Sequence, residues 1–188
     1  MNFWKPGPRR LRLRLRPGIN MVDIIVDIET TGVDPLKDQV VAIGMIGEWG
    51  GMRIFQGTNE KQILQEFWKE LRKGHEQVTI VGFNIDDFDW QFLKLRSLKH
   101  RVEIQHFQKY VQRKDIRLIL DANRLKKGTR LSDYCAFLGI PDGDELVGSM
   151  IPQLFAEGKY EEIKKHLEFD LDKTLQIWKL MKEYRVVE

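Results

Sequence analysis

The stretch Asp27-Ile28-Glu29-Thr30-Thr31-Gly32 follows directly on an apolar run that begins at Met21. Residues two apart in a strand point to the same face, so the carboxylates of Asp27 and Glu29 are expected to be neighbours. Two like charges a few Å apart repel strongly unless a cation lies between them. The stretch therefore predicts the end of a buried strand and a divalent-metal site. An alternative is that both acids only end the strand and accept hydrogen bonds from turn amides.

Length and composition predict one globular domain. The chain has 188 residues, of which 42% are apolar and 31% charged. The longest uncharged apolar stretch, Val40 to Gly47, is far shorter than the roughly 20 residues that cross a bilayer. No membrane partner is expected, and because the basic start of the chain lacks the features of a secretory signal, the cytosol is the expected compartment. The single cysteine, Cys135, is expected to be buried in a helix.

The excess positive charge lies in a basic N-terminal arm, residues 1–20, with six basic and no acidic residues. The remainder, residues 21–188, has 25 basic and 28 acidic residues and is expected to form the domain. Leucines alternate with arginines between Leu11 and Arg16, which predicts a strand that pairs with the first strand of the domain as a hairpin. An alternative is that the arm precedes the protein proper, because Met21 is itself a candidate start.

Hydrophobic periodicity predicts an α/β domain with a mixed β-sheet flanked by α-helices. The predicted strands are Val22–Glu29, Gln39–Trp49, Met52–Gln56, Val78–Gly82 and Ile116–Leu120, with a turn at Glu48–Gly51. The predicted helices are Asn59–Arg72, Asp87–Leu98, Leu131–Gly139 and Tyr160–Tyr184.

A second acidic segment, Asn84-Ile85-Asp86-Asp87-Phe88-Asp89, joins a predicted strand to a predicted helix. Asp86 or Asp87 is expected to cap that helix, where an acid also suits the helix dipole. Asp89 lies between two aromatic residues, Phe88 and Trp90, where a charge needs a partner.

The last predicted helix carries a third acid beside its buried stripe. The residues of the stripe are Ile163, Leu167, Leu171, Thr174 and Trp178. His166 and Asp170 lie four residues apart and therefore on one face of the helix, next to the stripe. A buried ionised Asp costs several kcal/mol unless it is paired or binds a metal. Lys173 is the alternative partner of Asp170.

Taken in order, these segments resemble the motifs of the DEDD superfamily of 3′-to-5′ exonucleases. The likeness is greatest to the proofreading exonuclease domain of family B DNA polymerases and its stand-alone relatives. It consists of Asp-x-Glu on a first strand, Asn-x-x-x-Phe-Asp before a middle helix, and an aromatic residue or His four residues before Asp on a late helix. Residues 82–96, 118–121 and 131–140 also resemble this group, and the likeness runs from about Met21 to Met181.

The resemblance implies an RNase H-like fold and a two-metal 3′-to-5′ exonuclease that acts on DNA ends, with single-stranded DNA as the expected substrate. The implied ligands of two Mg²⁺ or Mn²⁺ ions are Asp27, Glu29, Asp89 and Asp170. Their oxygen ligands also favour hard cations over zinc. The candidate substrate-binding residues are Thr30, Thr31, Asn84 and Phe88. Replication or repair proteins are candidate partners, and proofreading within the same chain is not expected because no polymerase domain is present.

His166 departs from the pattern of either exonuclease branch. The polymerase-like branch has Tyr four residues before the last acid, and the other branch has His five residues before it. One residue turns a helix by about 100°. His166 is expected to orient the attacking water or to act as a general base, and a structural role is the alternative.

Two other functions remain open on the sequence alone. One is an RNA exonuclease or a structure-specific nuclease of the same fold, because no residue is identified that reads a 2′-hydroxyl. The other is a degenerate nuclease fold that acts as a nucleic-acid-binding module.

Overall fold

The computed structural model describes residues 22–47, 51–71, 73, 77–104, 110–121 and 129–187. The predicted strand in the N-terminal arm lies outside these residues, as does most of the predicted turn at 48–51. Within the described residues, five strands form one sheet in the order β3-β2-β1-β4-β5. None of the helices in the described part of the chain is long and apolar enough to span a membrane.

The central strand of the sheet is β1 (Val22–Thr30), which lies between β2 (Val40–Gly47) and β4 (Gln77–Gly82). It runs antiparallel to β2 and parallel to β4. At the two edges, β3 (Met52–Gln56) pairs antiparallel with β2, and β5 (Tyr110–Asp115) pairs parallel with β4. The predicted mixed sheet is therefore confirmed.

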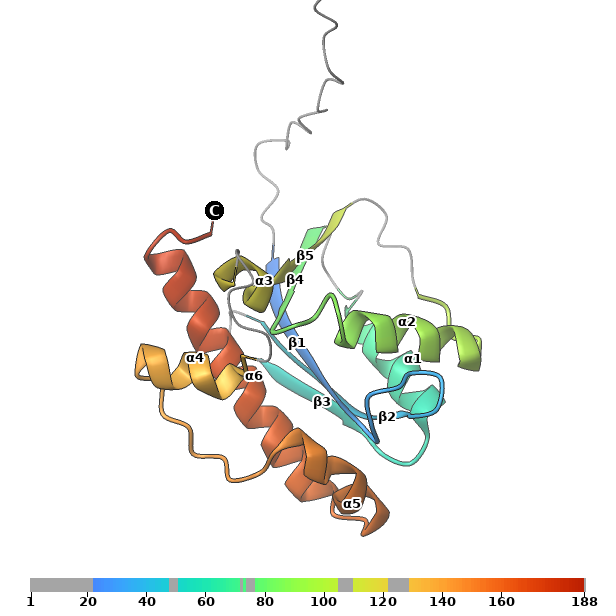
Figure 1. The fold of residues 1–188 in the computed structure, drawn as a ribbon. Helices are drawn as coiled ribbons and strands as arrows, with labels where there is room; N and C mark the ends of the chain where they lie inside the picture. Colours follow the sequence, from blue (N-terminus) through green and yellow to red (C-terminus); the bar gives the residue numbers. More distant parts are fainter. Residues whose placement is uncertain are drawn as a thin grey trace, which may run out of the picture.

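Helices cover both faces of the sheet (Figure 1). One layer consists of α1 (Glu60–Leu71) and α2 (Asp89–His100). The other is built on the long helix α6 (Tyr160–Glu183), with α4 (Leu131–Leu138) and α5 (Ile151–Ala156) packed against it. Apart from α5, these helices were predicted to within two residues at each end.

The alternation of side chains along β1 assigns the first two acids to the α6 face. The residues of β1 that pack in the α1–α2 layer are Ile24, Val26 and Ile28. Ile25 packs in the α6 layer. Asp27 and Glu29 have the same parity as Ile25, so they point to the face that α6 covers.

Gly44 lets α6 approach the sheet closely at this point. It lies opposite Asp27 in the antiparallel ladder between β1 and β2. A Cβ atom on Gly44 would lie 2.4 Å from Leu171 Cδ1 and 3.0 Å from Leu167 Cγ. These two leucines belong to the buried stripe of α6, which was predicted correctly and is buried throughout.

The prediction of a strand at Ile116–Leu120 is wrong, because this segment is the short helix α3 (Ile116–Leu120). The edge strand is the preceding, mostly polar segment Tyr110–Asp115. Asp115 caps α3 by accepting a hydrogen bond from the Leu118 amide at 3.2 Å. A short apolar run fits a strand and a buried helix equally well, and charged residues are common on edge strands.

The prediction that Asp86 or Asp87 caps α2 is also wrong. The helix begins at Asp89, and its N-cap residue Phe88 provides no side-chain hydrogen bond. The loop before α2 is held instead by Asp115, which accepts hydrogen bonds from the amides of Asn84 and Asp86 at 3.0 and 3.1 Å. A contact between residues about 30 apart in the chain cannot be inferred from local capping preferences. The short helices α5 and η1 (Gly148–Met150) were not predicted either.

Candidate active site

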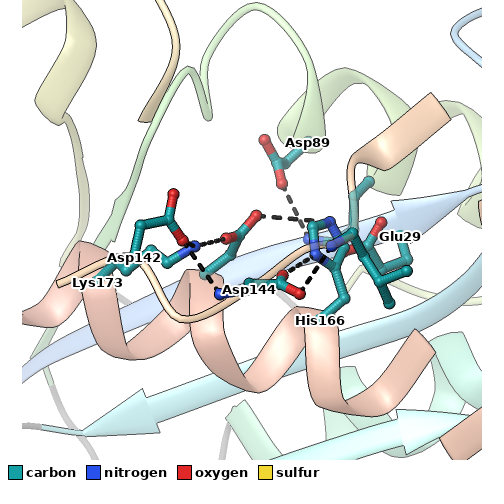
Figure 2. Close-up of polar contacts among 9 residues, drawn as sticks. Glu29, Asp89, Asp142, Asp144, His166 and Lys173 are labelled. Carbon is teal, nitrogen blue, oxygen red and sulfur yellow. Dashed lines mark hydrogen bonds and ion pairs between the residues drawn. The ribbon is translucent and has the colours of Figure 1, made fainter. Parts of the chain in front are cut away.

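The three acidic segments identified in the sequence meet at one cavity of about 630 Å³. Asp27 and Glu29 on β1 line it together with Asp170 on α6. Asp89, the first residue of α2, lies behind them and is only 3% exposed. It is fixed there by a hydrogen bond of 3.1 Å that its Oδ1 accepts from the Ile28 amide. Figure 2 shows Asp89 and its hydrogen bond to the backbone near Glu29.

Three carboxylates of this cluster, those of Asp27, Glu29 and Asp89, have raised pKa values because they are crowded and mostly buried. Burial raises the pKa of Asp27 well above its usual value, and three neighbours raise it further, namely Asp89, Glu29 and Asp170. Burial also raises the pKa of Glu29, with added repulsion from Asp170, Asp89 and Asp144. The pKa of Asp89 is raised to about 7, mainly by burial, although backbone hydrogen bonds act in the opposite direction. The protein itself therefore supplies too little positive charge for these acids.

His166 lies on α6 at the edge of the acidic cluster and is 5% exposed. Its Nε2 atom is 3.6 Å from Glu29 Oε1 and 3.8 Å from Asp170 Oδ2. Its other ring nitrogen, Nδ1, makes a short contact with the carboxylate of Asp144 (Figure 2). The three ligand atoms that Glu29, His166 and Asp170 offer all lie within 4.8 Å of one another.

Lys173 lies one turn after Asp170 on α6 and brings one positive charge to the site. Its Nζ atom is 2.6 Å from Asp142 Oδ1 and 3.2 Å from Asp170 Oδ1. Lys173, the alternative partner that the sequence offers for Asp170, therefore does contact this carboxylate. It does not neutralise the cluster, because the same ammonium group is shared with Asp142.

Sequence reasoning missed Asp142 and Asp144, which lie in the loop between α4 and η1. Both bind residues of α6, Asp142 through Lys173 and Asp144 through His166. The local signal is two acids separated by Gly143 after a proline, a pattern typical of surface turns. Only the packing of this loop over α6 shows that the two acids belong to the site.

The candidate substrate-binding residues divide into two pairs. Thr30 and Phe88 line the cavity. The Thr31 hydroxyl instead accepts a hydrogen bond from the Gln39 amide at 3.0 Å. The Asn84 side chain accepts one from Arg117 at 2.7 Å. Thr31 and Asn84 thus support the loops beside the site.

This sheet order is that of the RNase H-like fold, and acids from the first strand and from α6 line one cavity. Residues 37–186 match the family described as "Predicted 3'-5' exonuclease related to the exonuclease domain of PolB". The chain belongs to this family. An uncharacterized protein of Methanocaldococcus jannaschii is 45% identical to it, over 89% of this chain and 99% of that protein.

Solved structures show the same fold at low sequence identity. The family B DNA polymerase of Pyrobaculum calidifontis is similar with a TM-score of 0.71 at 18% identity, over 89% of this chain and 25% of the polymerase. The zinc-bound complex of E. coli exonuclease I with single-stranded DNA gives a TM-score of 0.67 at 14% identity, over 89% of this chain and 42% of that one. The chain thus corresponds to about a quarter of the polymerase and less than half of exonuclease I.

Proposed function

We propose that the protein is a metal-dependent 3′-to-5′ exonuclease that releases nucleotides from the ends of single-stranded DNA. The observation that carries this proposal is the cluster formed by Asp27, Glu29 and Asp170, which line the cavity, and Asp89, which lies behind them; Asp27, Glu29 and Asp89 have raised pKa values. The family relation supports cleavage in the 3′-to-5′ direction. The single-stranded DNA in the complex of E. coli exonuclease I supports that substrate.

The donor set fits two divalent cations. Carboxylate oxygens are the preferred ligands of Mg²⁺ and Mn²⁺, and the raised pKa values indicate that bound cations would relieve the repulsion. The residues that would hold the ions are Asp27, Glu29, Asp89 and Asp170. When bound, such ions activate a water molecule and stabilise the departing 3′ oxygen of the scissile phosphate.

The other residues of the cavity are suited to position the end of the strand. Phe88 presents an aromatic ring on which a terminal base can stack. Lys173 and Arg130 are basic residues that line the cavity and can contact phosphates. Asp89 keeps the end of β1 in place through the Ile28 amide, so that Asp27 stays directed at the reacting phosphate.

The basic N-terminal arm is proposed to bind the strand outside the cavity. Removing residues 1–20 is expected to weaken binding and to flatten its salt dependence, by about 0.7 in slope for each phosphate of a single strand that the arm neutralises. Binding measured at several salt concentrations tests this, and an unchanged slope would exclude the arm.

Cleavage of 5′-labelled oligonucleotides tests the activity itself. With Mg²⁺ or Mn²⁺, we expect a ladder of products shortened from the 3′ end of single-stranded DNA and none in EDTA. A duplex and an RNA strand of the same sequence are compared in parallel. A DNA substrate with a blocked 3′ end should stay intact. Cleavage that persists in EDTA or ignores the blocked end would contradict the proposal.

A pair of variants on α6 tests the site. Asp170→Asn should abolish cleavage, whereas Asp172→Asn is the matched control, because Asp172 is exposed and pairs with Gln176 at 2.7 Å. A ladder on RNA alone would favour an RNA exonuclease. Binding without cleavage by the folded protein would instead indicate a nucleic-acid-binding module.

A further inference from the structure

His166 lies among the proposed metal ligands. A residue that only orients a water molecule would stand apart from them. The Nε2 atom of His166 faces oxygens of Glu29 and Asp170 at 3.6 and 3.8 Å. Both distances are too long for hydrogen bonds. They suit two ligands of one ion, because atoms that each lie about 2.1 Å from a cation are about 3 to 4 Å apart.

Asp144 holds the ring of His166 in this orientation. It contacts Nδ1, and in the neutral ring a proton on Nδ1 directed at this carboxylate leaves the lone pair on Nε2, toward the cluster. A histidine that binds a metal commonly donates its second ring N–H to a carboxylate in this way. Both side chains are almost fully buried, at 7% and 6% exposure, so the arrangement is not that of a surface ion pair.

The four-residue spacing of His166 and Asp170 suits two ligands of a single ion. Residues four apart on a helix point to the same side, and this spacing lets two side chains of one helix bind a single ion. The two oxygens of Asp170 are divided between neighbours. Oδ1 is 3.2 Å from Lys173 Nζ, whereas Oδ2 faces His166. Lys173 therefore leaves the oxygen that faces His166 available.

We propose that His166 is a metal ligand through Nε2, together with Glu29 and Asp170, and that Asp144 is its positioning residue. This inference rests on the proposed function, because it concerns one of the ions of the same site. A nitrogen ligand also changes metal preference. Imidazole suits first-row transition ions, whereas Mg²⁺ takes oxygen ligands. The site is thus expected to bind Mn²⁺ more tightly than Mg²⁺.

Pulsed electron paramagnetic resonance of the Mn²⁺-loaded full chain tests the ligand without any substitution. A directly bound imidazole gives ¹⁴N modulation of the Mn²⁺ spin echo, and labelling the histidines with ¹⁵N should change its frequencies. The modulation should disappear in His166→Gln and persist in His100→Gln, since His100 contacts Glu60 in the α1–α2 layer. Circular dichroism in EDTA checks that both variants fold. Absence of nitrogen modulation in the unsubstituted protein would overturn the inference.

Calorimetric titration with MnCl₂ and MgCl₂ tests the positioning role and the selectivity. Asp144→Asn should weaken Mn²⁺ binding on the order of 10- to 100-fold and Mg²⁺ binding much less. Asp172→Asn is the control on the same helix as His166, because Asp172 is exposed and pairs with Gln176. Equal losses for both ions would show that Asp144 has only a structural role and would contradict the selectivity.

The two proposals fail in different ways. If the protein degrades DNA with Mg²⁺ and Mn²⁺ but shows no nitrogen modulation, the exonuclease assignment stands and the histidine ligand is excluded. If nitrogen modulation is present and depends on His166 but no nucleic acid is degraded, the metal ligand stands and the exonuclease function is excluded.

Discussion

Two of the regions in which the protein buries acidic side chains, the surroundings of Glu60 and the cavity, differ in the positive charge that their acids receive. In the α1–α2 layer, Glu60 accepts hydrogen bonds from Arg96 Nε and Nη2 at 2.8 and 2.7 Å and from the Val40 amide at 2.8 Å. His100 Nε2 is 2.6 Å from the same carboxylate. Burial acts to raise the pKa of Glu60, but these partners together hold it below its usual value. At the cavity, Asp27, Glu29 and Asp89 have raised pKa values instead.

This difference separates a structural acid from a functional one more clearly than burial alone. The Arg96 fork satisfies both oxygens of Glu60, so this pair needs nothing from outside the protein. The cavity acids share Lys173 with Asp142 and have His166 only at 3.6 Å or more. Perturbed pKa values of this kind are typical of functional sites.

The largest difference between the two regions should appear in activity. Asp27→Asn removes a metal ligand and is expected to reduce cleavage on the order of 10⁴-fold, while the stability in EDTA rises because one repelling charge is gone. Asp23→Asn is the control on the same face of β1. Asp23 accepts hydrogen bonds from Trp178 and Lys182, both at 3.0 Å, so this change should spare activity. If Asp27→Asn and Asp23→Asn were equally active, the distinction between the cavity acids and a structural acid would be wrong.

Stability should show the reverse order. Glu60→Gln leaves the buried Arg96 without its counter-charge and is expected to cost about 3–5 kcal/mol, while the folded fraction keeps its activity. Chemical denaturation measures the loss. Glu66→Gln is the control on the exposed side of α1, where the carboxylate accepts a hydrogen bond from Gln62 at 2.8 Å. If Glu60→Gln were as stable as the control, the ion pair would not be structural.

The two regions should respond to pH with opposite signs. Asp27, Glu29 and Asp89 have raised pKa values, so their stabilisation is complete below the unfolded pKa of about 4 and is lost as pH rises through the folded pKa, about 7 for Asp89. In EDTA, we expect the stability to fall by a few kcal/mol between about pH 5 and 8, and saturating Mn²⁺ to reduce this fall. Glu60, with a lowered pKa, stabilises the fold above its unfolded pKa and loses this effect as pH falls through its folded value.

Thermal melts of the protein at several pH values measure this dependence. A stability in EDTA that is flat or rises from about pH 5 to 8 would contradict the raised pKa values. In Glu60→Gln, the decline at neutral pH should persist, because it arises at the cavity, whereas part of the loss in acid should disappear.

The smallest expected effect comes from the packing of α6. Gly44→Ala places a methyl group against Leu171 and is expected to cost about 1–3 kcal/mol. It should also reduce cleavage, because His166 and Asp170 move relative to β1, without disturbing Glu60 and Arg96. Comparing kcat with the denaturation midpoint separates the two effects. Unchanged kcat would show that the site tolerates a shift of α6.

Most of the fold and the four carboxylates could be predicted because their signals are local. Asp27 and Glu29 end an apolar run, and His166 and Asp170 lie beside a regular helical stripe. The missed features depend on contacts between distant segments. Asp144 reaches His166 across 22 residues, and Asp115 orders the loop at Asn84 across 31. The edge strand Tyr110–Asp115 was missed because its charged side chains hide the strand pattern.

Diffraction from crystals soaked in MnCl₂ compares the two acidic regions most directly. With data collected where Mn²⁺ scatters anomalously, we predict density among Asp27, Glu29, Asp89 and Asp170, and none at Glu60. Density at Glu60, or no density at the cavity in the presence of excess Mn²⁺, would contradict the assignment of the cavity carboxylates as the metal site.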